Sequence, residues 1–166
     1  MLFKDITILD ENYDIKENMY VGVSGKKIDY IGSELPEKDY GEVYPGKGRL
    51  LMPAFYNAHA HSTMSLMRGY GENLVLDEWL NNKIFPFEAK LDHNSVYYGT
   101  LLAMAESLRF GIAGSQDMYY FIDDMVEAVT DSGAKANISR ALVNFTGEDF
   151  DSMASVQEMK KNSKRS

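Results

Sequence analysis

The first fifty residues contain three short segments in which apolar and polar positions partly alternate. Residues 2–9, 19–23 and 27–31 are rich in β-branched and aromatic side chains, and Ser24-Gly25-Lys26 separates the last two segments. Short alternating runs divided by a glycine-containing turn are typical of β-hairpins. A stretch rich in glycine and proline follows over residues 32–48, so the pattern predicts a hairpin-rich β segment that ends near residue 50.

After residue 50 the pattern predicts strands that alternate with helices. An apolar run over residues 50–56 predicts a buried strand, and residues 95–110 place apolar side chains at near-helical spacing. Asp92 or Ser95 is a candidate cap for that helix, and Gly111 is its candidate stop. The other predicted elements are a strand over 112–118, an acidic amphipathic helix over 121–130 ended by Gly133, and a strand over 136–144. This alternation predicts βαβ units and an α/β fold with a parallel sheet.

The composition excludes several classes of protein. With 17 Lys and Arg against 25 Asp and Glu, the 166-residue chain has a net charge of −8, which argues against a basic nucleic-acid-binding protein. The chain has no cysteine, so it can form neither a disulfide framework nor a thiol nucleophile. It also has no apolar leader and no run of about 18 apolar residues, so we expect neither secretion nor a membrane span, and a cytoplasmic location.

A pair of histidines follows the apolar run. The segment Asn57-Ala58-His59-Ala60-His61 places two imidazoles two positions apart at the predicted carboxyl end of a strand. Residues two apart in a strand point to the same side, so both rings could reach one divalent metal ion. Parallel barrels carry their chemistry at this end of their strands, which favours the metal interpretation. The alternative is that both histidines are ordinary polar residues that end a strand.

Four segments together resemble a known family. They are residues 51–61 (LMPAFYNAHAH), 67–70 (MRGY), 76–80 (LDEWL) and 85–91 (FPFEAKL). In this order they resemble the amidohydrolase superfamily, and within it the 5-methylthioadenosine/S-adenosylhomocysteine deaminases and their chlorohydrolase relatives. The resemblance runs from residue 1 to about residue 150. Trp79 and residues 117–119 also match, as packing and strand-end positions without a catalytic role.

The resemblance implies a fold and a set of site residues. Residues 1–53 would form part of a composite β-sandwich, and residues 54–150 the first units of a metal-dependent (β/α)8 barrel. His59 and His61 would be the first two ligands of a divalent metal, most commonly zinc. Glu88 would bind the ribose hydroxyls of a nucleoside, and Arg140 would lie in the substrate site. The resemblance also suggests a homo-oligomer.

Glu88 and Arg140 also have interpretations that do not depend on the resemblance. Glu88 follows Pro86 on a predicted apolar loop, where a carboxylate suits a diol, although a surface glutamate would look the same. Arg140 lies inside a predicted strand and therefore needs an anionic or polar partner, which an ordinary ion pair would also supply.

The chain lacks part of the family's pattern. In the family, two more histidines, an aspartate and the catalytic glutamate come from later strands, and the one other histidine here, His93, matches none of these positions. We therefore expect no catalytic residue within this chain and weak metal binding by His59 and His61 alone. A complete barrel takes about 250 residues, so residues 54–166 would form only about three to four of its eight units. With a divergent basic tail over residues 151–166, the pattern predicts the N-terminal part of a deaminase, shortened by truncation, a frameshift or an incomplete gene.

The sequence as a whole favours a metal-dependent hydrolytic deaminase of adenosine-type nucleosides, S-adenosylhomocysteine or 5-methylthioadenosine, whose isolated 166-residue chain is inactive. One alternative is an inactive fragment or a non-catalytic module of an amidohydrolase. Another is a different amidohydrolase, such as a guanine or cytosine deaminase or a triazine-type hydrolase, although Glu88 favours a substrate with a ribose. The expected partners are a small-molecule nucleoside and either further copies of the chain or a complementing C-terminal half, with no nucleic acid and no membrane.

Overall fold

The chain forms two compact units. The structure is a computed structural model that describes residues 1–142, 144 and 147–162. It divides into Met1–Pro53 and Ala54–Ser166, and each unit contains its own sheet.

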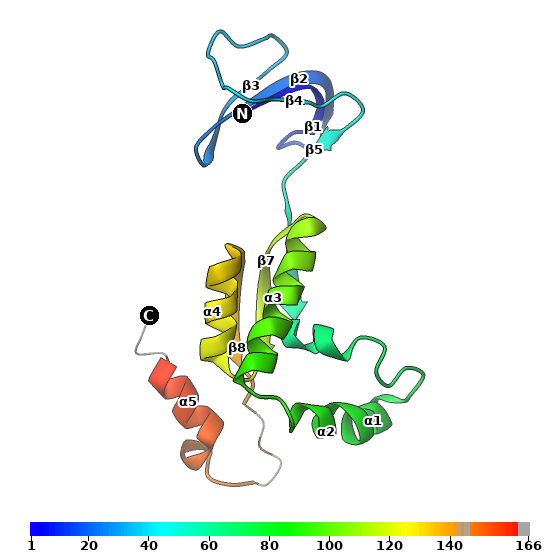
Figure 1. The fold of residues 1–166 in the computed structure, drawn as a ribbon, viewed down its shortest axis with the longest axis vertical. Coiled ribbons are helices and arrows are strands. Elements are labelled where there is room, and N and C mark those ends of the chain that lie inside the picture. The colour runs from blue at the N-terminus through cyan, green and yellow to red at the C-terminus, as the bar shows by residue number, and fades with distance from the viewer. Residues whose placement is uncertain (143, 145–146, 163–166) are drawn as a thin grey trace. The chain divides into compact units, whose positions relative to one another are not determined.

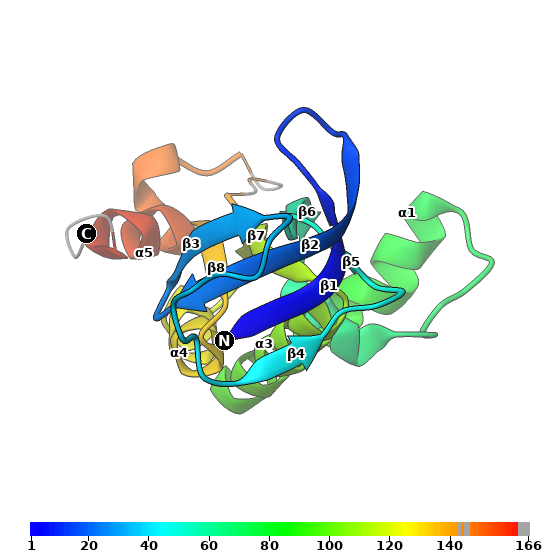
Figure 2. The ribbon, with the colours of Figure 1, turned by 90° about the horizontal axis from the view of Figure 1, so that it is seen from above.

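The first unit is a five-stranded sheet, seen most clearly in Figure 2. Its strands are β1 (Leu2–Leu9), β2 (Ile15–Ser24), β3 (Lys27–Gly32), β4 (Val43–Pro45) and β5 (Leu50–Leu51). They lie in the order β3-β2-β1-β4, with β5 also beside β1. Ser24 pairs with Lys27, so Gly25 and Lys26 form the turn, and Gly25 has a φ of 60° that glycine adopts without strain. The predicted hairpin is therefore confirmed, with β2 longer than the segment 19–23.

The second unit contains a three-stranded parallel sheet in the order β6-β7-β8, of which Figure 1 labels β7 and β8. Its strands are β6 (Phe55–Ala60), β7 (Ile112–Tyr119) and β8 (Lys135–Arg140). The predicted parallel βαβ arrangement is confirmed. β8 ends at Arg140, earlier than the predicted residue 144; residues 141, 142 and 144 are not in a strand, and residue 143 lies outside the described part of the chain.

The prediction that the apolar run forms a buried strand is wrong. The run is interrupted around Pro53, and in β6 the side chains of Phe55 and Tyr56 are 60% and 69% exposed. The physical reason is that β6 lies at an edge of the described sheet and pairs only with β7. An apolar run predicts a strand, but it does not tell whether anything covers that strand.

The second unit also contains helices, which all follow β6 in the chain. They are the 3₁₀ helix η1 (Ser62–Met67), α1 (Leu76–Trp79), the π-helical segment η2 (Leu80–Ile84), α2 (Phe85–Glu88), α3 (His93–Arg109), α4 (Ile122–Ser132), the 3₁₀ helix η3 (Phe150–Ser152) and α5 (Ala154–Asn162). The core of this unit consists of Met67, Ile84, Val96, Tyr119, Ile122 and Met125. Among the residues described, no helix is long and apolar enough to cross a membrane.

The predicted basic tail contains a helix. In α5 and just before it, Val156 and Met153 are buried, and Lys160 forms an ion pair with Asp151 at 2.7 Å. These apolar side chains pack, so the segment predicted to be a divergent basic tail is helical from Ala154 to Asn162. Residues 163–166 lie outside the part of the chain that the structure describes.

Asp92, one of the two candidate caps, caps the longest helix that the structure describes. Its Oδ1 accepts hydrogen bonds from the hydroxyl and the backbone N–H of Ser95, at 2.6 and 2.8 Å, and α3 ends at Arg109, two residues before Gly111. The bond from the Ser95 hydroxyl and then the bond from its backbone N–H hold the pKa of Asp92 below its usual value.

This cap predicts a specific pH dependence. Because the pKa of Asp92 is lower in the folded state, its ionised form stabilises the fold above the unfolded pKa, and this stabilisation is lost as the pH falls through the folded value. Asparagine caps equally well without titrating. We therefore expect the Tm of Asp92→Asn to fall less than the Tm of the wild-type chain when the pH is lowered below about 4. Thermal unfolding followed by circular dichroism measures both. Glu127→Gln on α4 is the control; parallel Tm curves for wild type and Asp92→Asn would contradict the prediction.

Candidate functional site

Three adjacent strands bring the candidate residues to one edge of the second sheet. Ala60 of β6 is the register partner of Asp117 in β7, and Tyr119 is the partner of Arg140 in β8. The carboxyl ends of parallel strands lie at the same edge, so His61, which follows β6, is close to residues that the sequence places far away.

His59 and His61 converge. Their Nε2 atoms lie 3.1 Å apart, and the two rings meet edge to face with centroids separated by 4.7 Å. His61 Nδ1 lies 2.7 Å from the carbonyl oxygen of Met118. A carbonyl can only accept a hydrogen bond, so Nδ1 carries the proton and the Nε2 of a neutral His61 presents a lone pair. Metal-binding histidines are held in the same way by a hydrogen bond from the other ring nitrogen.

This geometry fits two ligands of one zinc ion. Two nitrogens 3.1 Å apart, each at the usual 2.0–2.1 Å from a shared zinc, subtend about 95–100° at the metal, close to a tetrahedral arrangement. Within the described part of the chain there is no group of three or more His, Cys, Asp or Glu side chains that could hold a metal ion. A catalytic zinc has about three protein ligands, so the pair fits part of such a site.

Asp117 fixes the chain immediately after His61. It is fully buried (0% exposed), and its Oδ1 accepts a hydrogen bond of 3.2 Å from the backbone N–H of Ser62. Its Oδ2 has no hydrogen-bond partner among the described residues. The sequence indicates only a packing role for this position. The signal that points to more is its spacing, because Asp117 and Tyr119 are two apart on one strand and share a face, as His59 and His61 do.

Glu88 is helical, which corrects the prediction that it lies on a loop. It is the last residue of α2, and Pro86 follows the π-helical segment η2 within a helical run that begins at Leu76. Glu88 Oε1 accepts a hydrogen bond of 2.8 Å from the hydroxyl of Tyr119. Glu88, Tyr119 and His61 line one cavity of about 310 Å³, to which Trp79 also contributes; we call it the histidine cavity.

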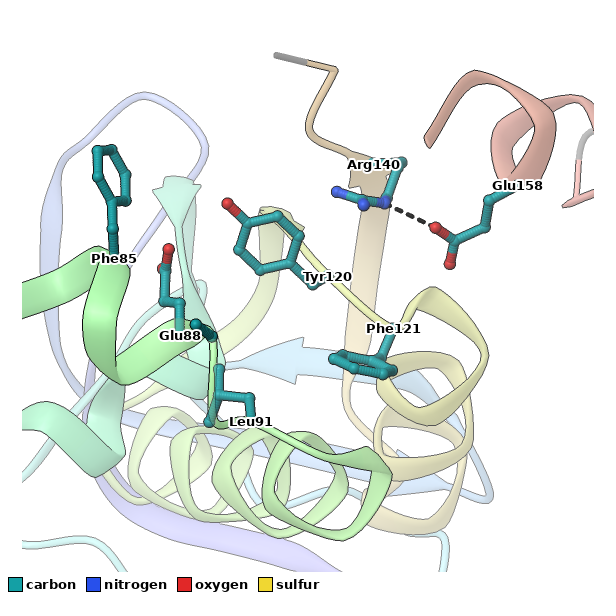
Figure 3. Close-up of a pocket in the computed structure, with 8 residues that line it drawn as sticks. Phe85, Glu88, Leu91, Tyr120, Phe121, Arg140 and Glu158 are labelled. Atoms are coloured by element: carbon teal, nitrogen blue, oxygen red, sulfur yellow. Dashed lines mark hydrogen bonds and ion pairs between the residues drawn. The ribbon is translucent and has the colours of Figure 1, made fainter. Parts of the chain in front are cut away.

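Arg140 is the last residue of β8 and lines a second cavity, of about 490 Å³, which we call the arginine cavity (Figure 3). Its Nε donates to Glu158 Oε2 at 2.8 Å, and its Nη1 donates to the carbonyl of Ala141 at 2.9 Å. Its guanidinium carbon lies 4.7 Å from the centroid of the Tyr120 ring. The sequence suggested either an ion pair or a substrate contact, and the structure shows an ion pair at the wall of a cavity.

The two cavities meet at Glu88. Phe85, Glu88 and Tyr120 line both, so the histidine cavity with His61 and the arginine cavity with Arg140 are neighbours. His59 does not line either cavity, but it shares with His61 a third hollow of about 420 Å³ along β6 and α3. His61 therefore lines both the third hollow, which it shares with His59, and the histidine cavity, which it shares with Glu88.

His93 is not part of this arrangement. Its Nδ1 lies 2.7 Å from Asp124 Oδ2, and its ring packs edge to face on Phe121. It joins the start of α3 to α4.

The sequence indicates only a packing role for Tyr119 and singles out neither Tyr120 nor Glu158. Tyr119 holds Glu88, Tyr120 stacks under Arg140, and Glu158 pairs with Arg140. A pair of tyrosines at the end of a parallel strand is a recognisable signal for the first two. Nothing in the sequence around Glu158 marks it.

Several deaminases are similar in sequence to most of this chain. A 5-methylthioadenosine/S-adenosylhomocysteine deaminase from Dictyoglomus thermophilum is 35% identical over 92% of the chain, but this match covers 36% of that protein. A second protein of the same name, from Archaeoglobus fulgidus, is 37% identical over 90% of the chain and 35% of its own length. A 5'-deoxyadenosine deaminase from Methanobrevibacter smithii is 36% identical over 90% of the chain and 34% of its own length. The chain therefore spans about a third of the length of these relatives.

Solved structures are also similar. An adenosine deaminase from Xanthomonas campestris with bound zinc is 29% identical, with a TM-score of 0.65 over 81% of this chain and 32% of that one. The atrazine chlorohydrolase TrzN from Arthrobacter aurescens, complexed with zinc, has a TM-score of 0.75 over 84% of this chain and 35% of that one; at 21% identity this shows a shared fold alone.

The family model gives the assignment. The model described as the amidohydrolase family matches residues 50–166, which is most of the chain and extends beyond residue 150, where the motif resemblance ends. The histidine pair lies inside this match, and the similar proteins named above confirm the resemblance to the N-terminal part of such deaminases. The chain belongs to the amidohydrolase family.

Proposed function

We propose that this chain provides the metal-binding and nucleoside-binding part of a hydrolytic deaminase that acts on adenosine-type nucleosides, with S-adenosylhomocysteine and 5-methylthioadenosine as the leading substrates. One observation carries the proposal: His61, one of two convergent imidazoles, lines the same cavity as the carboxylate of Glu88. A nucleoside has a base that reacts and a ribose diol that can be recognised. A free base or a triazine offers no diol to Glu88.

Each side chain then has a separate task. His59 and His61 would hold a divalent metal, most commonly zinc, which when bound supplies the Lewis acidity that makes water a nucleophile near neutral pH. Glu88 accepts hydrogen bonds from the two ribose hydroxyls, and Arg140 faces the substituent at the 5' position in the adjoining cavity. The overall reaction replaces a C–N bond of the base by a C–O bond, consumes one water and releases ammonia.

The proposed reaction requires more polypeptide than the described residues supply. We interpret residues 1–53 as part of a composite β-sandwich and residues 54–150 as the first units of a (β/α)8 barrel, which the separate five-stranded sheet and the parallel β6-β7-β8 sheet support. The further metal ligands would come from a complementing segment that completes the barrel. The relatives extend well beyond the third of their length that this chain matches.

A binding measurement tests the recognition half of the proposal. Trp79 is the single tryptophan of the chain and lines the histidine cavity, so its fluorescence reports on what enters there. We expect adenosine and 5-methylthioadenosine to give saturable quenching that Glu88→Gln weakens about tenfold, because charge-assisted hydrogen bonds to the diol are lost. Guanine serves as the control. Equal quenching by guanine and adenosine, insensitive to Glu88→Gln, would contradict a nucleoside site.

A chimera tests the reaction. Residues 1–150 would replace the matched third of the Dictyoglomus thermophilum relative, and ammonia release from nucleosides would be measured with bound zinc quantified on the same sample. We expect turnover of adenosine-type nucleosides that His61→Ala abolishes. A folded chimera with stoichiometric zinc that hydrolyses only guanine or a chlorotriazine would overturn the proposal in favour of another amidohydrolase activity.

The Arg140–Glu158 pair predicts an effect on substrate preference. The Glu158 carboxylate accepts the hydrogen bond of Arg140 Nε, so it competes for the guanidinium with any anionic group that enters the arginine cavity. We expect Glu158→Gln to raise the affinity for S-adenosylhomocysteine, which has a carboxylate, by about threefold to tenfold, and to leave adenosine unchanged. Trp79 fluorescence titrations measure both ligands. Asp151→Asn, which alters an exposed ion pair with Lys160 nearby, is the matched control.

A further inference from the structure

Glu88 depends on a neighbour for its position. The turn that carries it, α2, continues directly from α1 through η2, so the helical run holds the backbone of Glu88 but does not select a rotamer of its side chain. A glutamate side chain has several rotatable bonds and loses much conformational freedom when it is held. The hydroxyl of Tyr119 restrains it by donating to Glu88 Oε1 at 2.8 Å across 31 residues of sequence, and Tyr120 also interacts with the same carboxylate.

Tyr119 is well suited to hold a carboxylate. It is the last residue of β7 and only 4% exposed, so its ring is fixed by the sheet and by the core around it. Burial and then the hydrogen bond to Glu88 raise the pKa of Tyr119, so its hydroxyl remains a donor throughout the physiological range. The bond uses one of the four acceptor positions of the Glu88 carboxylate, which leaves the others for hydroxyl donors.

The same tyrosine also lies beside the histidine pair. Its ring centroid is 6.4 Å from that of His61, and both residues line the histidine cavity. Figure 3 shows the Glu88 carboxylate between Phe85 and Tyr120, at the wall of the arginine cavity. Tyr119 is therefore hydrogen-bonded to Glu88 and also lies beside His61.

We propose that Tyr119 is a positioning residue that fixes the Glu88 carboxylate for the ribose diol and thereby sets the preference for ribonucleosides over nucleosides that lack the two hydroxyls. The inference rests on the proposed function, because it requires that Glu88 contacts ribose. Tyr119 itself does not need to touch the substrate. Tyr119 holds one oxygen of the Glu88 carboxylate, so the side chain is already in one rotamer before the ligand binds. Binding the ribose hydroxyls then costs less conformational entropy.

The test compares adenosine with 2',3'-dideoxyadenosine. Trp79 fluorescence titrations of the zinc-supplemented 166-residue chain give the ratio of the two Kd values for each variant. For the wild type we expect adenosine to bind about tenfold more tightly, and for Glu88→Gln we expect nearly equal binding. For Tyr119→Phe we expect the preference to fall about threefold to fivefold while the affinity for the dideoxynucleoside stays unchanged. A merely structural defect would weaken both ligands.

A matched control is present in the same unit. The hydroxyl of Tyr97 donates to Asp131 Oδ2, also at 2.8 Å and across 34 residues, but neither residue lines the two cavities. Tyr97→Phe removes the same kind of bond and should leave the Kd ratio unchanged. Tyr120→Phe addresses the neighbouring ring, since burial and then the negative charge of Glu88 raise the pKa of Tyr120 as well. Loss of the preference in Tyr120→Phe but not in Tyr119→Phe would overturn the inference.

The outcomes separate the two proposals. A wild-type chain that binds both nucleosides equally, with no effect of Glu88→Gln, would overturn the proposed ribose contact itself. A preference that Glu88→Gln abolishes and Tyr119→Phe preserves would overturn only the role of Tyr119. If Tyr119→Phe does not fold, the ¹³Cζ chemical shift of Tyr119 decides. The shift should move in Glu88→Ala and stay fixed in Glu158→Gln, and an unmoved resonance in Glu88→Ala would refute the hydrogen bond.

Discussion

Replacing His61 by alanine is expected to lower the zinc affinity of this chain on the order of a hundredfold. Loss of a residue that merely orients a metal ligand costs about 10-fold to 100-fold, so loss of a ligand should reach at least the upper end of that range. His61 is the better choice of the pair because its Nδ1–H is held by the Met118 carbonyl, which directs Nε2 toward the Nε2 of His59. Competition with a chromophoric zinc chelator measures the affinity of the tag-free chain directly.

His93→Ala is the control for this experiment. His93 is the third histidine of the chain, and it pairs with Asp124 and packs on Phe121, away from the converging pair. Its replacement should leave zinc affinity within about twofold, because a histidine outside the site contributes no ligand. Equal losses in His61→Ala and His93→Ala would show that zinc binds at scattered histidines. The interpretation of His59 and His61 as one site would then fail.

The histidine pair could be predicted from the sequence because it depends on local rules. Strand periodicity places His59 and His61 on one side, and the carboxyl ends of parallel strands are where such folds collect chemistry. The same holds for the cap of α3, since Asp92 and Ser95 contact each other within one turn. In each case the partners are a few residues apart, so spacing alone constrains their geometry.

Contacts across the sheet edge could not be predicted in this way. The Tyr119–Glu88 bond joins the end of β7 to a short helix that follows a π-helical segment, and neither periodicity nor Pro86 indicates that Glu88 is helical. The partner of Arg140 could not be predicted either, because it also lies on an element that is distant in the sequence. A strand-end arginine calls for an anion, but the anion here is Glu158 on α5, a helix that the basic composition of the tail conceals.

Burial was the other property that local patterns could not supply. The apolar residues of β6 predict a strand correctly, yet Phe55 and Tyr56 remain exposed because burial depends on which elements cover the sheet. The reverse is true of Asp117. Its type predicts exposure, but it is fully buried beside the chain that follows His61. Such a buried carboxyl group is costly unless another part of the molecule makes use of it.

Asp117→Asn should therefore stabilise the chain and weaken its zinc site. The amide oxygen can still accept the hydrogen bond from the Ser62 N–H, while the substitution removes a carboxyl group whose Oδ2 has no partner among the described residues. A buried amide costs less than a buried carboxylate, so we expect the free energy of unfolding to rise by about 1–3 kcal/mol in urea titrations. Zinc affinity should fall about 10-fold to 100-fold, because a negative group beside the ligands stabilises a bound cation.

The opposite signs of these two effects make the prediction specific. A substitution that simply damages packing lowers stability and affinity together, whereas a group kept for the metal lowers stability in the metal-free chain and raises affinity for the cation. Asp151→Asn removes a carboxylate from an exposed ion pair and should change the unfolding free energy by less than about 0.5 kcal/mol without altering zinc binding. A destabilised Asp117→Asn chain with unchanged zinc affinity would mean that Asp117 only supports the turn after His61. A gain in stability with a loss of affinity would mean that the buried carboxylate is retained for the metal.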